Sequence, residues 1–289
     1  MILQVSHLTR YYYSQKVHLS PHRLYLRPRE TPRHKLRRFT SDFAPPARMV
    51  TTLDAADNVL AWCYWNDAVT AVNLSTEFEI ETLDANPFDF VVRPDAAGYP
   101  FKYDADERTA LAAFLWLPAS ETAERLKRWL AEAIPQAPQE TVAYLDAVNN
   151  AVRRAVEYTR REESGILEPL ATLDQGKGSC RDSATLLIAV LRTMGLAARF
   201  VSGYLYEPPP DAGTPAVPTA MHAWTEVFIP GAGWKGLDST RGIFCNDAFV
   251  PVAHAAQGAT VSPVQGSYYG PPSTTAELQA DITVQRVDV

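Results

Sequence analysis

The stretch QGKGSCRDSATLLIAVLRTM, at residues 175–194, carries the clearest structural pattern in this chain. Its apolar residues recur at helical spacing, most clearly at Ala184, Leu187, Ile188 and Leu191. This spacing predicts a buried helix that begins at Cys180. Ser179 lies directly before the helix and Asp182 follows three positions later, which is the spacing of a capping box that satisfies backbone N–H groups at a helix start.

Cys180 would lie in the first turn of this helix. Unpaired backbone N–H groups and the positive end of the helix dipole favour an anion there. Both therefore favour the thiolate, which is the nucleophilic form of cysteine. Glycines at positions 176 and 178 allow a tight turn and leave room for a substrate. The alternative is a structural cysteine, because free cysteines are among the most buried residues, and this stretch alone does not separate the two.

The composition limits the class of protein. The chain has 289 residues, of which 46% are hydrophobic, so it can form one large domain or two ordinary ones. A formal net charge of −6 argues against a dedicated nucleic-acid binder. The three cysteines, Cys63, Cys180 and Cys245, are too scattered for a disulfide framework and lack the paired spacing of a zinc site. We therefore expect neither a metal nor a cofactor.

The first residues, MILQVSHLTRYYYSQKV, lack the apolar segment of a secretory signal. No apolar run reaches the roughly 18 residues that a membrane-spanning helix needs. Together with the few cysteines, these features favour a reduced, cytoplasmic protein without a membrane partner.

Residues 1–100 are predicted to form an N-terminal β-sandwich domain. Every second residue shares one face in the first run, which holds Leu3, Val5, His7 and Thr9. Further strand-like runs follow at the spacing of a sandwich, at residues 22–27, 59–65, 69–74 and 78–83. Residues 1–49 hold ten Lys and Arg against two Asp and Glu. Because these charges are interspersed, they favour the solvated face of strands over a surface for a polyanion or a partner.

A second domain is predicted over residues 101–289, after a linker at residues 95–103. Apolar stripes and prolines predict helices at residues 106–116, 120–134 and 139–161. After the cysteine helix we expect a strand at residues 197–206 and a proline-rich exposed loop at residues 207–219, which is either a lid or a variable insertion. From residue 240 the chain is expected to be loop-like, apart from a closing strand at residues 281–289.

The stretch MHAWTEVFIPGAGWKGLD, at residues 221–238, predicts a β-hairpin. His222 lies near one end of the hairpin and Asp238 near the other, with a turn at residues 230–233. A four-residue loop would set Asp238 opposite Thr225, a few residues short of His222. A wider loop or a bulge would bring His222 and Asp238 side by side.

Cys180, His222 and Asp238 have the residue types of a thiol triad. A cysteine nucleophile needs a base, and the base needs an orienting acid. We expect His222 to take the thiol proton, or to hold it as an imidazolium, while Asp238 fixes the ring and steadies its charge. His254, expected in a loop, is the competing histidine. The backbone N–H of Cys180 is the expected first oxyanion donor, and Gln175 is a candidate for the second.

The segments GSCRDSATLLIAVLRTMGLAARFVSGYL and HAWTEVFIPGAGWKGLDST resemble the bacterial transglutaminase-like superfamily, whose fold is papain-type. Members carry a cysteine at a helix N-terminus, a histidine in an HAW strand and an aspartate after a GW turn, which match Cys180, His222 and Asp238. The early segment HLTRYYYSQKV, with DAADN further on, is similar to the β-rich N-terminal domain of many bacterial members. The resemblance implies acyl-enzyme chemistry on an amide.

The predicted fold is therefore α+β: an N-terminal β-sandwich, then a papain-like domain whose cysteine helix packs on an antiparallel sheet. The predicted function is acyl transfer on amide or peptide bonds through a thioester at Cys180. Hydrolysis is preferred over protein-glutamine transamidation, because no residue pattern suggests an amine site. A non-catalytic binding scaffold of the same fold is the alternative of a different class. We expect a protein or peptide substrate, and the sequence does not predict an oligomeric state.

Overall fold

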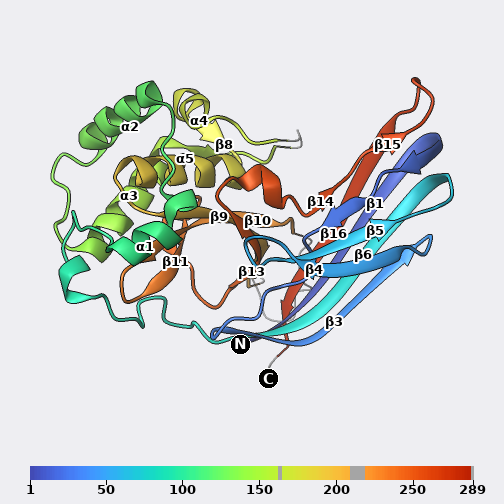
Figure 1. Cartoon of the computed structure of the whole chain (residues 1–289), viewed down its shortest axis with the longest axis horizontal. Coiled ribbons are helices and arrows are strands. Elements are labelled where there is room, and N and C mark those ends of the chain that lie inside the picture. Colours follow the sequence, from blue (N-terminus) through green and yellow to red (C-terminus); the bar gives the residue numbers. More distant parts are fainter. Residues whose placement is uncertain (162–164, 209–218, 288–289) are drawn as a thin grey trace.

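A computed structural model gives the structure of the chain and describes residues 1–161, 165–208 and 219–287. A region of two antiparallel sheets lies beside a third antiparallel sheet, which is covered by a layer of helices (Figure 1). The fold is therefore α+β, as predicted. Most of the proline-rich loop expected at residues 207–219 lies outside the described residues.

Two antiparallel sheets build the strand-rich region. The first has the order β15-β1-β6-β3, with β16 also paired to β1, and the second has the order β14-β2-β5-β4. The first sheet contains β1 (Ile2–Leu19), β3 (His34–Ala44), β6 (Val69–Thr82), β15 (Tyr268–Tyr269) and β16 (Ala276–Arg286). The second contains β2 (His22–Leu24), β4 (Arg48–Leu53), β5 (Val59–Tyr64) and β14 (Val264–Gln265). The predicted alternation in β1 is confirmed, because its buried face holds Leu3, Val5, His7 and Thr9.

The two sheets pack as a sandwich. Val17 and Leu74 of the first sheet lie in one apolar cluster with Leu24 and Cys63 of the second. Three of the strands come from the far end of the chain, at residues 264–286, and β16 runs along β1 (Figure 1). A division of the chain at residue 100 stays a prediction, and the sheets draw strands from both sides of it.

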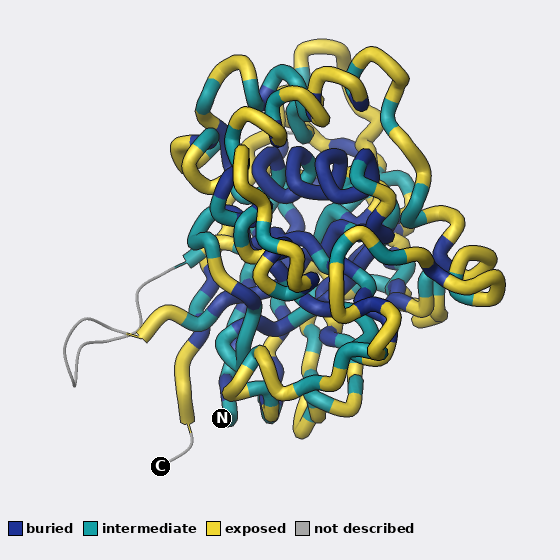
Figure 2. Tube along the Cα trace, turned by 90° about the vertical axis from the view of Figure 1, so that its left-hand side faces the viewer, coloured by how far each residue is buried: buried dark blue, intermediate teal, exposed yellow. Residues whose placement is uncertain are grey.

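The third sheet is antiparallel, in the order β12-β11-β10-β9-β13. It contains β9 (Ala198–Leu205), β10 (His222–Ile229), β11 (Gly233–Asp238), β12 (Ile243–Phe244) and β13 (Phe249–Ala255). Helix α5 (Cys180–Thr193) packs on β9 and β10. It is the central helix that is buried along nearly its whole length (Figure 2), because apolar residues occupy most of its circumference.

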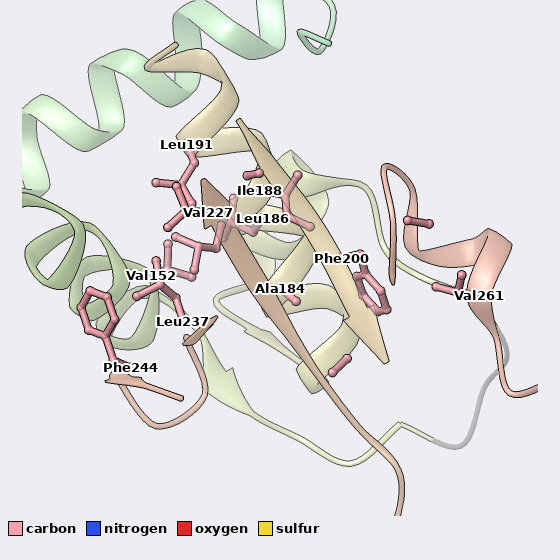
Figure 3. Packing of buried hydrophobic residues seen from close by; sticks show 14 of the residues in the cluster. Val152, Ala184, Leu186, Ile188, Leu191, Phe200, Val227, Leu237, Phe244 and Val261 are labelled. Atoms are coloured by element: carbon pink, nitrogen blue, oxygen red, sulfur yellow. The ribbon is translucent and has the colours of Figure 1, made fainter. Parts of the chain in front are cut away.

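The core between α5 and the third sheet follows from the predicted helical spacing. Ala184 and Leu191 of α5 are buried and belong to one apolar cluster with Val227 of β10 and Leu237 of β11 (Figure 3). Figure 3 also shows Val152 of the neighbouring α3 (Thr141–Ala155) directed into the same cluster. The helix that carries Cys180 is therefore held from both sides.

Further helices surround α5. They are η1 (Pro94–Ala96), α1 (Ala105–Ala110), η2 (Ala112–Phe114), α2 (Ser120–Ala133), α3 and α4 (Pro169–Gln175). Helix α3 was expected to reach residue 161, but it ends at Ala155 because Val156 is extended. The Glu157 N–H then donates to the Gly176 carbonyl at 2.8 Å. This bond starts a parallel pair of short strands, β7 (Glu157–Tyr158) and β8 (Lys177–Gly178). Helix α4 was not predicted.

The expectation of a loop-like chain after residue 240 is wrong, because β12, β13 and η3 (Gly258–Val261) lie there. Pro251 interrupts the alternation of β13, and the register of β13 against β9 shifts directly after it. Proline is tolerated in a sheet at such an irregularity. Residues 281–286 of the predicted closing strand belong to β16.

The predicted linker at residues 95–103 is tied to the core by two tyrosines. The Tyr99 hydroxyl donates to the Met194 carbonyl at 2.7 Å, and the Tyr103 hydroxyl donates to the Phe228 carbonyl at 2.8 Å. These bonds anchor the segment at the end of α5 and on β10. Within the three described ranges, no helix combines the length and apolar character needed to cross a membrane.

Candidate active site

Cys180 is the first residue of α5, as the sequence predicted. Ser179 and Asp182 form the predicted capping box. The Asp182 carboxylate accepts hydrogen bonds from the Ser179 N–H at 2.8 Å and from its hydroxyl at 2.7 Å. The Leu167 N–H donates to the same fully buried carboxylate at 2.8 Å, and Arg161 Nε lies 3.0 Å from it. These contacts fix the start of the helix and with it the position of the thiol.

Strand β10 places His222 opposite Gly203 of β9. A side chain does not fit at position 203, because a Cβ there would lie 2.2 Å from the Val250 carbonyl oxygen. Three residues after the histidine, the Thr225 hydroxyl donates to the Ala184 carbonyl of α5 at 3.0 Å. The strand is therefore bonded to the first turns of the cysteine helix, which brings His222 to Cys180.

The hairpin turn is one residue shorter than predicted. Gly233 already pairs with Ile229, so three residues form the turn and the register moves by one. Leu237, rather than Asp238, is the partner of Thr225. Gly233 has a φ of 75°, a conformation that glycine adopts without strain, and this allows the strand to begin directly after the turn.

Asp238 reaches His222 diagonally across the two strands. If the register continued, Asp238 would lie opposite Trp224, on the face that Trp224 shares with His222. Asp238 Oδ2 lies 2.9 Å from His222 Nε2, so the two side chains meet without the wider loop or bulge that was one of the alternatives. Since Nε2 bonds to the acid, Nδ1 is the ring nitrogen that is left for the thiol.

The Asp238 carboxylate is completely buried and accepts hydrogen bonds at both oxygens. Oδ1 accepts from the Thr240 N–H at 2.9 Å and from its hydroxyl at 2.7 Å. Oδ2, besides the histidine, accepts from Arg241 Nη1 at 3.2 Å. Burial raises the pKa of this carboxyl, but the bonds from His222 and Thr240 and the charge of the imidazolium outweigh burial, so the pKa is lowered. Asp238 therefore stays ionised.

Cys180 and His222 shift each other's pKa in opposite directions. Burial raises the pKa of the Cys180 thiol, but the hydrogen bond and charge of His222 and the Ala223 N–H outweigh it, so the pKa is lowered. Burial lowers the pKa of His222, but Asp238 and the thiolate raise it to about 9. Both shifts favour a thiolate next to an imidazolium over the neutral pair.

The other two cysteines lack this environment. All three are free thiols. Burial raises the pKa of Cys63 to about 11, and burial also places the pKa of Cys245 well above its usual range. The thiolate is therefore favoured at Cys180 and disfavoured at both other positions.

Two further predicted residues lie apart from this cluster. Gln175 is the exposed last residue of α4, and none of the hydrogen bonds between described residues joins its side chain to Cys180. His254 was expected in a loop, but it lies in β13 with its Nδ1 2.6 Å from Arg29 Nη1. Burial first, and then the nearby arginines, lower the pKa of His254 to about 3. His254 is therefore neutral and does not compete for the thiol. In the described ranges, no group of three or more His, Cys, Asp or Glu side chains could hold a metal ion.

The sequence prediction missed residues that border the cluster. Thr240 and Arg241 follow Asp238 by two and three positions, a spacing at which aspartate commonly binds the backbone after it. Arg241 also pairs with Glu207. Tyr158 of β7 lies close enough for its pKa to be raised by burial and then by the charge of Cys180. A hydroxyl residue two positions after Asp238 was the signal in the sequence that indicates the role of Thr240.

A helix that presents a thiol at its start, packed on an antiparallel sheet whose hairpin carries a bonded histidine and aspartate, defines a protein of papain-like architecture. Residues 128–239 match the Transglutaminase-like superfamily, and residues 3–81 match the Bacterial transglutaminase-like N-terminal region. The chain therefore belongs to the transglutaminase-like superfamily, as its motifs implied.

Relatives and solved structures extend this likeness over most of the chain. The chain is 28% identical over 281 residues to the protein Rv2569c of Mycobacterium tuberculosis, covering 92% of this chain and 87% of the relative. It is 32% identical over 114 residues to ML0607 of Mycobacterium leprae, covering 39% of this chain and 40% of that one. A structure from Cytophaga hutchinsonii, named a "Putative Cysteine Protease", has a TM-score of 0.74 and 16% identity, covering 100% of this chain and 92% of the other. The last comparison shows that the fold is shared.

Proposed function

We propose that this protein is a cysteine-nucleophile acyl-transfer enzyme that hydrolyses amide or peptide bonds through a thioester at Cys180. The observation that carries the proposal is the hydrogen-bonded pair of Cys180 and His222, in which the thiol pKa is lowered and the imidazole pKa is raised to about 9. A nucleophile that is ionised near neutral pH, at a helix start, is what attack on an amide carbonyl requires.

In the first step, the Cys180 thiolate attacks the carbonyl carbon, a C–S bond forms and the carbonyl electrons move to oxygen. The backbone N–H of Cys180 is the proposed first donor to that oxyanion. The His222 imidazolium then gives its proton to the amide nitrogen, the C–N bond breaks and an amine leaves. A thioester on Cys180 and a neutral His222 remain.

In the second step, His222 takes a proton from water and the resulting hydroxide attacks the thioester carbonyl. The C–S bond then breaks and a carboxylic acid leaves. His222 keeps the proton that it took from water, so the imidazolium again lies beside the Cys180 thiolate. Asp238 accepts the Nε2–H bond throughout, which keeps Nδ1 directed at the sulfur and stabilises the imidazolium charge.

Hydrolysis is preferred over transamidation because no group in the sequence suggested an amine site. The substrate class that we propose is a protein or peptide, and the proposed compartment is the cytoplasm, where free thiols persist. A binding scaffold of the same fold would not need an activated thiol, so the lowered pKa of Cys180 favours an enzyme.

Alkylation by iodoacetamide tests the activated thiol. We expect Cys180 to react at pH values well below the ordinary thiol pKa of about 8.5. We expect His222→Ala to remove the reactivity of Cys180 at these pH values. His18→Ala, at an exposed histidine of β1, is the matched control and should leave the profile unchanged. Mass spectrometry assigns the label to each of the three cysteines. A Cys180 that reacts no faster than an ordinary thiol would favour the scaffold.

A labelled amine offered together with casein separates the two reactions. Release of peptides without incorporation of the amine supports hydrolysis. Incorporation that is lost in Cys180→Ala would replace hydrolysis by transamidation while leaving the thioester mechanism in place.

A further inference from the structure

One side of the β-sandwich has two edge strands that face each other, one from each sheet. β3 and β4 are the terminal strands of their sheets, and among the described strands each pairs with a single neighbour, β6 and β5 respectively. A free edge carries unpaired N–H and C=O groups that can accept a further strand.

The edge of β3 carries the features that prevent such pairing. Its register against β6 shifts between Leu36 and Arg38, which marks a bulge or irregularity. Lys35, Arg38 and Asp42 are exposed along the strand. Irregularities and charges are the devices that keep a free edge from pairing with another chain.

The edge of β4 is less protected, because its register has no irregularity and Arg48, at its start, is its one charged residue. Its sequence is RMVTTL, all six residues are exposed, and its register against β5 is regular from Arg48 to Leu53. Its large apolar side chains stay in contact with solvent, with exposed fractions of 43% for Met49, 46% for Val50 and 61% for Leu53. A regular, β-branched and apolar edge of this kind is a ready acceptor for another strand.

A cavity of about 250 Å³ lies behind this edge, between the two sheets. Its walls come from both edge strands and the strands next to them, and they include Leu24, Phe39, Phe43, Met49, Thr51 and Ala61. Protein interiors are normally close-packed, and a cavity of about 150 Å³ already holds a benzene molecule. Because Met49 and Thr51 line the cavity from β4, alternate side chains of a strand added to β4 would point into it too.

The charges at this edge are basic. Arg27 lines the cavity with its guanidinium carbon 5.2 Å from the centre of the Phe39 ring, and Arg48 begins β4. Among the ion pairs that join described residues, neither arginine takes part, whereas Arg37 and Arg38 of β3 are each paired with a glutamate of β6. The open edge therefore favours an occupant that brings negative charge.

We propose that β4 binds an extended peptide segment of a partner protein by strand addition, with an apolar side chain in the cavity and an acidic residue near Arg27 or Arg48. A second copy of β4 fits less well, because RMVTTL contains no acidic residue and would bring a second Arg48. This binding site uses none of the residues around Cys180, so it does not depend on the proposed chemistry.

The test uses the full chain with Cys180→Ala, so that the probe is not consumed. The probe is a fluorescein-labelled peptide, Asp-Val-Thr-Phe-Thr-Val-Asp, whose apolar side chains share one face of a strand. We expect a rise in fluorescence anisotropy on binding and slower hydrogen exchange of the β4 amides. The same peptide with lysine in place of aspartate should bind several-fold more weakly, and a central proline, which lacks the N–H donor, should remove binding.

Substitutions in the protein locate the site. We expect Val50→Lys at the edge and Ala61→Leu in the cavity each to weaken binding by about tenfold or more, and the double variant of Arg27→Gln and Arg48→Gln to weaken it and flatten its salt dependence. Thr40→Lys, on the protected β3 edge, is the matched control and should leave binding unchanged. Binding that is absent up to about 1 mM, or that Val50→Lys does not alter, overturns the proposal. Self-association that Val50→Lys abolishes also overturns it, because a second copy would then cover β4.

Discussion

Ion pairs surround Asp238 and also lie along β3, but the two sets have opposite surroundings. Asp238 is fully buried with His222 and Arg241 against it, whereas the pair of Arg38 and Glu79 has exposed fractions of 51% and 35%. In the first region, each acceptor oxygen has a donor. In the second, water can replace either partner. The number of ion pairs in a region therefore says little about its stability, because burial determines how much each pair contributes.

The early basic run belongs to the exposed kind. Its arginines at 33, 37 and 38 pair with Asp84, Glu81 and Glu79 on or next to the neighbouring strand. These pairs support the solvated strand face that the interspersed charges favoured in the sequence. The small contribution expected of each pair follows from competition with water and salt.

The largest effect is expected at the buried end of the comparison. Asp238→Ala leaves His222 buried without its acid, and removing one partner of a buried pair costs about 3–5 kcal/mol of unfolding free energy. Urea unfolding measures this change. Asp281→Ala, at an exposed acid that pairs with Arg10 in the first sheet, is the control. A loss at position 238 as small as at position 281 would contradict the distinction.

A pH series in Cys180→Ser isolates the contribution of His222. We expect the pKa of His222 to stay raised in this variant, because Asp238 still bonds to the ring. A group whose pKa is raised in the folded state stabilises the fold fully below its unfolded pKa of 6.5. This stabilisation is lost as the pH rises through the folded-state pKa, which is about 9 in the intact pair. We expect the unfolding free energy to fall by about 1–3 kcal/mol between pH 6 and 9.

The intact protein should show a smaller change over the same range. The lowered pKa of Cys180 acts in the opposite sense, since its stabilisation is present at high pH and is lost as the pH falls. The two groups exchange one proton, so their contributions offset each other. A slope in the intact protein as steep as in Cys180→Ser would show that the two groups are not coupled.

Arg241 lies between the two extremes, with 34% of its side chain exposed. In Arg241→Gln, Asp238 keeps its bonds from His222 and Thr240, so the unfolding free energy should fall by about 1 kcal/mol. Removal of a cation next to Asp238 should raise the pKa of His222 further. Nuclear magnetic resonance titration of the His222 ring measures this pKa. An unchanged pKa would exclude an influence of Arg241 on the pair, and a lowered pKa would contradict the expected sign.

The smallest effect is expected on β3. The double variant of Arg37→Gln and Arg38→Gln should change the unfolding free energy by about 0–1 kcal/mol, and less at high salt. Thermal unfolding at low and high ionic strength measures this. A larger loss of unfolding free energy that persists in high salt would show that these exposed pairs contribute as much as buried ones.

Local patterns carried most of what the sequence could predict. The helical spacing of residues 184–191 and the capping box of Ser179 and Asp182 depend on neighbours along the chain, and the structure contains both. The meeting of His222 and Asp238 was predicted, but its register was not, because a positive φ at Gly233 lets the ladder begin one residue earlier.

The features that were missed depend on distant parts of the chain or on irregular backbone. β13 escaped because Pro251 breaks the period of two on which strand prediction depends. The end of α3 at Ala155 is set by the carbonyl of Gly176, which lies some twenty positions away in the sequence. Neither the cavity behind β4 nor the contact of Arg241 with Asp238 has a signature in local spacing.

The pairing of β16 along β1 makes one strand dependent on another that is synthesised much later. Residues 3–13 gain their neighbours at residues 276–286 after the intervening chain has been synthesised. Closing so long a loop is entropically costly, and contacts between such distant positions slow folding. During synthesis, β1 can therefore pair with β6 on one side only, and its other side gains a partner when residues 276–286 have emerged.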